Sequence, residues 1–212
     1  MKNLPRRFLT AHTTVLTAAL ILSSSLLLTA CATAPQSTAL FDLGPLRAQT
    51  AVNAGAPLPA ISVADIKAPT WLDSQAMFYR LNYANDLQPR PYSASKWTMA
   101  PAQLFLLRLK SRLSQAGGVV VPASDGAVNL PILRIEADDF SQGFDSAGQS
   151  SGNIAMRASV FDGRILRAQK MFVKQVPAAS ADAQGGAVAL AAASDAIINE
   201  MAVWLATLPP KK

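Results

Sequence analysis

The sequence predicts an α+β domain, in which a mainly antiparallel sheet is covered by two amphipathic helices, after a cleaved N-terminal signal peptide. Two long segments, 101–116 and 187–208, repeat their apolar residues with the helical period, whereas several shorter segments alternate apolar and polar residues as strands do. The elements follow one another in the order strands, helix, strands, helix. This order is typical of the α+β class.

The first 30 residues have the organisation of a secretory signal peptide. Lys2, Arg6 and Arg7 form a positive start, and Thr13–Ala30 carries no charge. A retained transmembrane helix is the alternative for an uncharged stretch of this length. Seven serine and threonine residues dilute the apolar run, however, which favours cleavage.

The leader ends in Leu28-Thr29-Ala30-Cys31, the residue order that the lipoprotein signal peptidase reads. Cys31 is the only cysteine of the chain. We expect its thiol to receive a diacylglyceryl group and the chain to be cut after Ala30. Two or three acyl chains make release from a membrane negligible, because each buried methylene contributes about 0.8 kcal/mol. Ala32 is not the aspartate that retains bacterial lipoproteins at the inner membrane, so we expect the outer membrane, facing the periplasm.

Residues 31–39 are expected to form a lipidated tether and residues 40–208 a single domain. The tether after Cys31 reaches about 25 Å when extended, at roughly 3.3 Å per residue. Half of the residues are hydrophobic and 15% are charged, as expected for a chain with one packed core. Three of the 19 basic residues leave with the leader, so the mature charge is +3 rather than +6. The remaining basic residues are scattered, which argues against nucleic acid as a partner.

The mature chain lacks the side chains of the common catalytic sites. Its only histidine, His12, lies in the leader, and its only cysteine is acylated, so a Ser-His-Asp triad, a Cys-His dyad or a His/Cys zinc site cannot be built. Asp138 and Asp139 are expected to point to opposite faces at a solvated strand end. We therefore predict no enzyme activity, no metal site and no cofactor.

The first half of the domain is predicted to hold three strands. They cover 40–43, 60–66 and 75–83, with a flexible loop at 47–59 and a proline-rich turn after Leu87. In the third strand Met77, Tyr79, Leu81 and Tyr83 share one face.

Three residues of this half, Trp71, Arg80 and Trp97, form a candidate binding cluster. The structural alternative, which we favour, is that the tryptophans pack the sheet against the following helix while Arg80 pairs with a neighbour.

The predicted helix 101–116 starts at Pro101 and stops at Gly117-Gly118. A helical wheel places Phe105, Leu109 and other apolar residues on the core side and directs Leu104 and Leu107 outward. This outward pair is the candidate partner surface.

The second half of the domain is predicted to complete the sheet and to close it with a helix. Strands are expected at 119–121, 133–138, 154–161 and 165–173, with a loop at 143–152 and a hairpin turn at Asp162-Gly163. In the closing helix 187–208, Leu190, Ile197, Met201, Trp204, Leu205 and Leu208 face one way, and Asp195, Asn199 and Val203 face the other.

These features together resemble the ABC-type transport auxiliary lipoprotein family. The resemblance rests on the lipobox, Leu40-Phe41-Asp42-Leu43, Ala68-Pro69, Trp71-Leu72-Asp73 leading into Tyr79-Arg80, Tyr83-Ala84, Trp97 and Trp204. It implies a docking component beside an ABC transporter and an MCE-domain protein, which together move lipids or other apolar molecules across the envelope. It implies no cofactor, gives Trp71, Asp73, Tyr79, Arg80 and Trp97 a structural role, and leaves homo-oligomerisation open.

Two other classes of function compete with this interpretation. One is a lipoprotein that regulates or builds the cell envelope without a transport role, which requires the same anchor and the same kind of domain. The other is an envelope hydrolase, which requires a nucleophile with a base and therefore a Ser-Lys pair in this chain.

Replacement Cys31→Ser is expected to abolish acylation and to leave an unprocessed precursor, because a hydroxyl does not replace the thiolate as acyl acceptor. Labelling with radioactive palmitate measures this directly against the unmodified chain. A serine variant that still takes up label and fractionates with the outer membrane would contradict the predicted anchor.

Overall fold

The computed structural model describes residues 37–47 and 57–209. The predicted signal peptide, Cys31 and most of the 47–59 loop lie outside these residues. Thr38–Lys212 forms a compact unit of its own, and every residue of the hydrophobic core belongs to it. This unit therefore contains the hydrophobic core that the described residues form.

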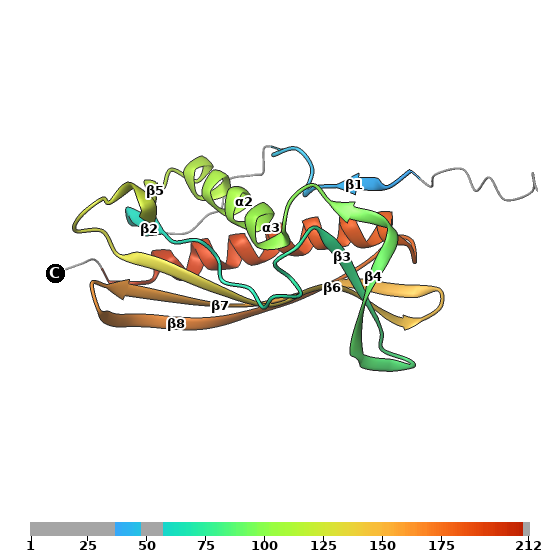
Figure 1. Cartoon of the computed structure of the whole chain (residues 1–212). Helices are drawn as coiled ribbons and strands as arrows, with labels where there is room; N and C mark the ends of the chain where they lie inside the picture. The colour runs from blue at the N-terminus through green and yellow to red at the C-terminus, as the bar shows by residue number, and fades with distance from the viewer. Residues whose placement is uncertain (1–36, 48–56, 210–212) are drawn as a thin grey trace, which may run out of the picture. The chain divides into compact units, whose positions relative to one another are not determined.

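Eight strands and two long helices make up the domain (Figure 1). The strands are β1 (Ala39–Phe41), β2 (Ile61–Val63), β3 (Ala76–Leu81), β4 (Asn85–Trp97), β5 (Val120–Pro122), β6 (Ile132–Ser146), β7 (Gln149–Asp162) and β8 (Ile165–Pro177). The helices are α2 (Pro101–Gln115) and α3 (Ala183–Ala206), and a short 3₁₀ turn covers Ala123–Asp125.

The long strand β6 organises the sheet. One of its edges pairs with β7 in an antiparallel ladder, and β7 pairs in turn with β8. The other edge is shared by two parallel partners, since Ser62 of β2 pairs with Ile132 and Tyr79 of β3 pairs with Gln142. The complete order is β1-β4-β3-β6-β2-β5, with β7 and β8 beyond β6.

The sheet is thus mixed, although its longest ladders are antiparallel. The sequence predicted the α+β class and a mainly antiparallel sheet, but not the four parallel pairings that involve β1, β2 and β3. Alternation of apolar and polar residues reports which face of a strand is buried and carries no information about the direction of its neighbour.

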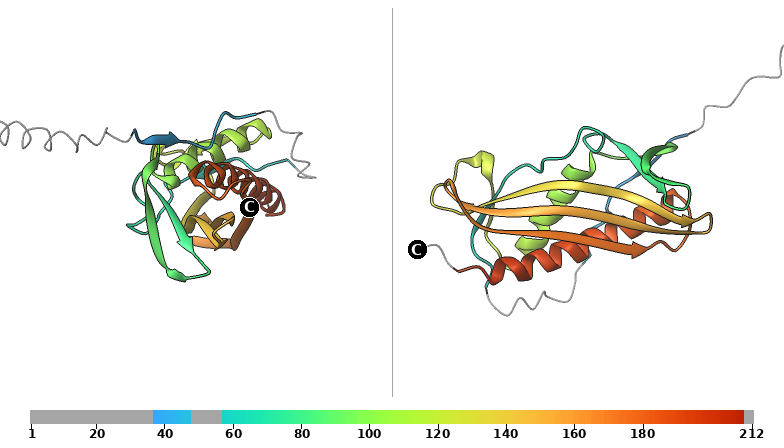
Figure 2. Two further views of the ribbon diagram at one scale, coloured as in Figure 1. Left: turned by 90° about the vertical axis from the view of Figure 1, so that its right-hand side faces the viewer. Right: turned by 90° about the horizontal axis from the view of Figure 1, so that it is seen from below.

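Both helices cover the same face of the sheet. Figure 2 shows this face from the side and the uncovered face of β6, β7 and β8 from below. α3 lies across β7 and β8 and contacts α2. Phe105 of α2, Leu133 of β6, Met156 of β7 and Leu190 of α3 are fully buried in the single core between the layers.

Helix α3 begins at Ala183, four residues before the predicted start, because Asp182 caps it. The Asp182 carboxylate accepts a hydrogen bond from the Gly185 amide at 2.7 Å. By length and composition α3 is apolar enough to cross a membrane, and it is the one such helix among the described residues. Half of its most apolar window is buried inside the domain, as expected for a core helix.

The predicted proline-rich turn after Leu87 is wrong, because β4 continues through Pro89 and Pro91. In this half β4 pairs only with β3, since β1 reaches only Ser95–Trp97. Such an edge tolerates prolines, which cannot donate to a ladder.

The predicted loop 143–152 is also wrong, because β6 runs to Ser146 and β7 begins at Gln149. Gly143 and Gly152 are needed for close packing. A Cβ atom on Gly152 would lie 2.7 Å from the Leu190 amide nitrogen of α3.

Replacement Trp97→Ala is expected to lower the free energy of unfolding by about 3–5 kcal/mol, as truncation of large core aromatics does. Trp97 is 0% exposed and packs edge-on against Phe140 at 5.6 Å between ring centroids. Thermal melting of the soluble domain should fall by roughly 6–20 °C. The half-buried Trp71 supplies the control, since Trp71→Ala should cost less. Unchanged melting of the Trp97→Ala domain would contradict a core role.

Candidate functional site

The structure separates the predicted Trp71, Arg80 and Trp97 cluster. Trp97 lies in the core. Trp71 packs edge-on against Phe78, with 5.2 Å between the ring centroids. The Arg80 guanidinium lies over the Trp71 ring, 5.3 Å from its centroid. Arg80 also donates to the Asp86 carbonyl at 2.8 Å. Met77 is fully buried, so alternation directs Phe78 and Arg80 to the opposite face, away from the helices.

Asp139 lies near this Trp71–Arg80 pair, inside β6 rather than at a strand end. A register shift between Ala137 and Asp139 leaves Asp138 exposed and Asp139 half-buried. Burial raises the pKa of Asp139. Neighbouring groups lower that pKa in part. The Ser141 hydroxyl donates a hydrogen bond to the carboxylate at 2.8 Å, and Arg80 contributes its positive charge. The prediction of a solvated strand end is therefore wrong. The bulge turns this carboxylate into a neighbour of Arg80.

Tyr79 faces the helix side and belongs to a network at the start of α3. Its ring lies 4.7 Å from that of Tyr92, whose hydroxyl donates to Gln142 at 2.9 Å. Gln142 donates in turn to the Ser150 hydroxyl at 2.8 Å and to the Asp182 carbonyl at 3.0 Å. Burial first, and then the nearby Tyr79 and Asp182, raise the pKa of Tyr92. Tyr92 therefore stays a neutral donor that links β4 to β6.

Asp73 lies in the exposed turn that leads into β3. Its amide donates to the Pro69 carbonyl at 3.2 Å. The Trp71-Leu72-Asp73 motif thus shapes the approach to β3, and Leu72 is 1% exposed in the core.

The predicted outward pair on α2 is wrong for Leu104. Leu104 is 7% exposed and belongs to the core, whereas Leu107 is 49% exposed. Leu104, Arg108 and Arg112 follow one another at four-residue spacing and form one stripe of the helix. Both arginines contact α3 and the segment after β1, so this side of α2 is covered.

Asp195 of α3, which the helical wheel placed outward, binds both arginines of that stripe. Arg108 and Arg112 donate to its carboxylate at 2.6 and 3.1 Å, and all three side chains are at most 16% exposed. Arg108 also donates to the Gly44 carbonyl at 2.9 Å, and Arg112 to the Arg47 carbonyl at 2.6 Å. We call Arg108, Arg112 and Asp195 the arginine clamp. It ties both helices to the segment that follows β1.

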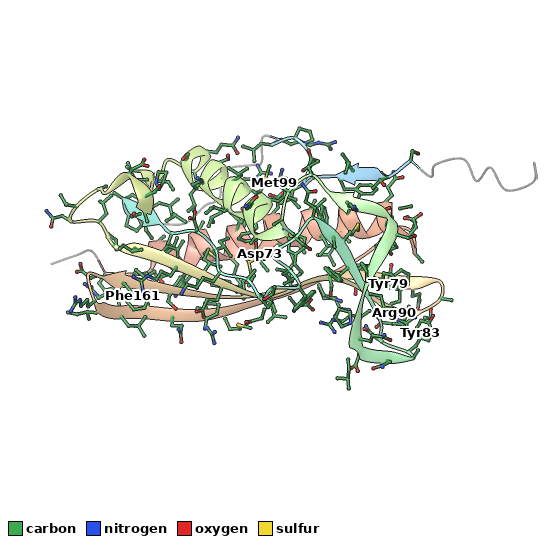
Figure 3. The ribbon with its side chains drawn as sticks, in the orientation of Figure 1. Asp73, Tyr79, Tyr83, Arg90, Met99 and Phe161 are labelled. Carbon is green, nitrogen blue, oxygen red and sulfur yellow. The ribbon has the colours of Figure 1, made fainter. Side chains whose placement is uncertain are left out.

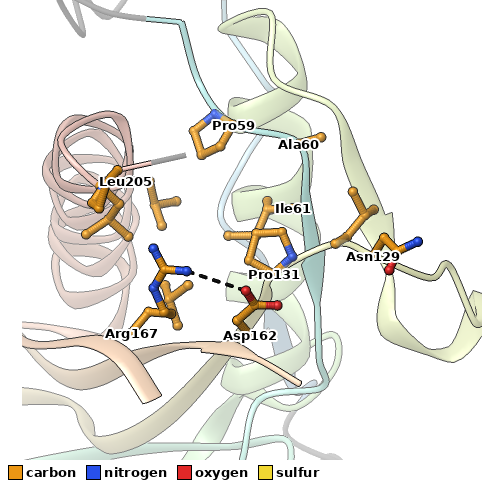
Figure 4. A pocket seen from close by; sticks show the side chains of 12 residues that line it. Pro59, Ala60, Ile61, Asn129, Pro131, Asp162, Arg167 and Leu205 are labelled. Atoms are coloured by element: carbon orange, nitrogen blue, oxygen red, sulfur yellow. Dashed lines mark hydrogen bonds and ion pairs between the residues drawn. The ribbon is translucent and has the colours of Figure 1, made fainter. Parts of the chain in front are cut away.

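A pocket of about 350 Å³ lies at the C-terminal end of α3 (Figure 4). Its walls come from the approach to β2, from the approach to β6, from the β7–β8 hairpin and from the end of α3. The lining residues are Pro59, Ala60, Ile61, Asn129, Leu130, Pro131, Val160, Asp162, Arg167, Leu205, Leu208 and Pro209. No pattern in the sequence predicts this pocket. Among the described residues, no group of His, Cys, Asp or Glu is arranged to hold a metal ion.

Comparisons with known proteins define the class. The model of the ABC-type transport auxiliary lipoprotein component family matches residues 41–202, and the chain belongs to this family. It is therefore an envelope-associated auxiliary component of ABC-type transport. No curated protein matches the sequence.

Two solved structures share the fold. The crystal structure of protein XCC0632 from Xanthomonas campestris, assigned to family model DUF330, has 17% identity and a TM-score of 0.67, and the match covers 78% of this chain and 93% of that one. The crystal structure of an uncharacterized protein has 15% identity and a TM-score of 0.61, with 78% and 97% covered.

Replacement Asp195→Ala is expected to destabilise the domain by about 3–5 kcal/mol, because it leaves two arginines without their buried counter-charge. Chemical denaturation measures the loss. Glu200→Ala supplies a control on the same helix, since the Glu200–Lys170 pair is exposed and should contribute under about 1 kcal/mol.

The clamp also gives a pH dependence. Burial raises the pKa of Asp195, but the hydrogen bonds and charges of Arg108 and Arg112 outweigh burial and hold that pKa below its usual range. Its stabilising effect is therefore present above about pH 3.9 and is lost as the pH falls through the lowered value. The difference in the free energy of unfolding between the unmodified domain and the Asp195→Asn variant should therefore shrink as the pH falls below about 3.9. A difference that stays constant would contradict the clamp.

Proposed function

We propose that this chain is the outer-membrane-anchored docking component of an ABC transporter–MCE system that moves lipids or other apolar compounds across the envelope. The acylated Cys31 holds domain 40–208 at the outer membrane, facing the periplasm, and an MCE-domain protein binds the domain. The observation that carries the proposal is the family match over 41–202, directly downstream of the lipobox Leu28–Cys31.

The way the chain enters the domain supports a docking role. β1 begins at Ala39, so the tether from Cys31 spans about 25 Å at most. β1 then pairs with β4, and the arginine clamp holds the carbonyls of Gly44 and Arg47. The first described residues after the predicted tether are thus held in the domain by strand pairing and by the arginine clamp.

The β3–β4 hairpin supplies the surface that we propose for the MCE partner. The hairpin projects from the sheet on the side away from the helices, and Figure 3 labels Tyr83 at its tip. Tyr83 is 54% exposed and Leu87 is 85% exposed. An aromatic and an aliphatic side chain on a projecting hairpin suit insertion into a partner, since exposed aromatics are enriched at interfaces. This hairpin replaces the Leu104 and Leu107 pair as the leading surface.

The double replacement Tyr83→Glu and Leu87→Glu is expected to abolish co-purification with the MCE protein. Two charges cannot be buried cheaply in an interface, whereas at exposed positions they should change stability by under about 1 kcal/mol. The measurement is affinity purification of the lipidated chain from detergent-solubilised envelopes, with melting of the soluble domain as the folding check.

Two single replacements complete this experiment. Val128→Glu is the matched control, because Val128 is 79% exposed in a loop outside the hairpin. Leu107→Glu tests the remaining exposed residue of the predicted α2 surface. Full co-purification of the hairpin variant would move the interface elsewhere. Failure of the unmodified lipoprotein to retain any MCE protein would count against the transport role and favour a regulatory or structural lipoprotein.

A further inference from the structure

The pocket at the end of α3 has the composition of a site for an apolar chain. Ile61, Val160 and Leu205 are buried at 3% exposure or less, and the half-buried apolar side chains around them are proline, alanine and leucine. The lining contains no aromatic ring, so a planar ligand finds no stacking partner. Its size, about 350 Å³, lies near the lower end of the roughly 300–1,000 Å³ of typical ligand pockets. A single flexible hydrocarbon chain suits this space better than a two-chain lipid.

One side of the pocket carries charge. Arg167 and Asp162 form an ion pair at 3.4 Å within the lining, and Figure 4 shows this pair on the sheet side, away from Pro59 and Ala60. Their side chains are 30% and 21% exposed, so water and solutes reach them. A guanidinium group has five N–H donors, which allows Arg167 to bind Asp162 and an anionic head group together.

The loop at the mouth of the pocket has an unusual backbone. Asn129 is the only non-glycine residue with positive φ among the residues that the structure describes, at 63°. Asparagine tolerates this region better than most residues, but the conformation still needs support from its surroundings. Asn129 precedes Leu130 and Pro131, so its conformation sets how these two apolar residues line the pocket.

We propose that this pocket binds one acyl chain that carries an anionic head group, a carboxylate or a phosphate. The chain lies among the aliphatic residues, and the head group accepts hydrogen bonds from Arg167. This inference adds ligand binding to the proposed docking role. It rests on the pocket alone and does not depend on the MCE partner.

Binding is measured with the soluble mature chain, residues 32–212, which contains the complete compact unit. The probe is radiolabelled dodecanoate, whose bound fraction is measured by equilibrium dialysis against unlabelled competitors. We expect saturable binding that dodecanoate and dodecyl phosphate compete for. Dodecanol, which lacks the charge, should compete about tenfold more weakly. Inorganic phosphate alone should not compete. The ratio of the affinities of dodecanoate and dodecyl phosphate, obtained from this competition, identifies the preferred head group.

Variants on opposite walls locate the ligand. Ala60→Phe and Leu208→Trp each fill the pocket from a different element and should weaken probe binding at least about tenfold without lowering the melting temperature. Arg167→Gln should remove the preference for dodecanoate over dodecanol. Arg164→Gln is the matched control, because Arg164 belongs to the same hairpin and does not line the pocket.

Absence of saturable binding to the unmodified chain would overturn the proposal. Unchanged probe affinity in both folded pocket-filling variants would also overturn it. If one of these two variants fails to fold, the probe affinity of the other variant tests the proposal. Co-purification with an MCE protein is scored separately in the same variants. Absence of acyl binding to the unmodified chain with retained co-purification removes only this inference, and acyl binding without co-purification of an MCE protein removes only the docking role.

Discussion

The close approach of α3 to the β6–β7 hairpin is the constraint on which the rest of the domain depends. A Cβ atom on Gly152 would meet the backbone of α3, and one on Gly186 would meet the Gln142 side chain of β6. Only glycine allows helix and sheet to pack at this distance. Gln142 then reaches the Asp182 carbonyl at the start of α3, and the Asp182 carboxylate caps the helix. The position of α3 in turn determines where Asp195 meets α2 and where Leu205 closes the apolar pocket.

Much of the architecture follows from local sequence signals, and the errors have identifiable physical causes. Pro101 and the Gly117-Gly118 stop delimit α2 well, and a two-residue hairpin turn joins β7 and β8, although it consists of Gly163 and Arg164 rather than the predicted Asp162 and Gly163. Glycine and proline were misread elsewhere because each has two roles. Gly143 and Gly152 serve packing inside strands rather than a loop, and Pro89 and Pro91 lie in the part of β4 that has a partner strand on one edge only, rather than in a turn. Local composition cannot distinguish these roles, since each depends on a neighbour that is distant in sequence.

The candidate sites were harder to predict than the fold, because they depend on contacts between distant elements. A helical wheel assumes one buried face, but α2 is buried against the sheet and also against α3, so Leu104 is covered. The spacing of Arg108 and Arg112 was a usable signal, since two arginines one turn apart need acceptors, but their partner Asp195 lies on another helix. The pocket left no signal, because its lining comes from four separate segments. The prediction for Cys31 is of the opposite kind, since it rests on a contiguous four-residue motif and on no contact between distant elements.

The arrangement of these features suits a component that connects a membrane to a transport complex. β1 lies at the edge of the sheet beside β4, and β4 leads back to the exposed hairpin that carries Tyr83. The anchor side of the chain and the proposed docking hairpin are therefore joined through one continuous pairing of strands. The apolar pocket lies at the other end of β6, where β2 and the β7–β8 turn meet the end of α3. The proposed ligand pocket and the proposed docking hairpin thus lie in separate parts of the domain, so an occupied hairpin would leave the pocket open.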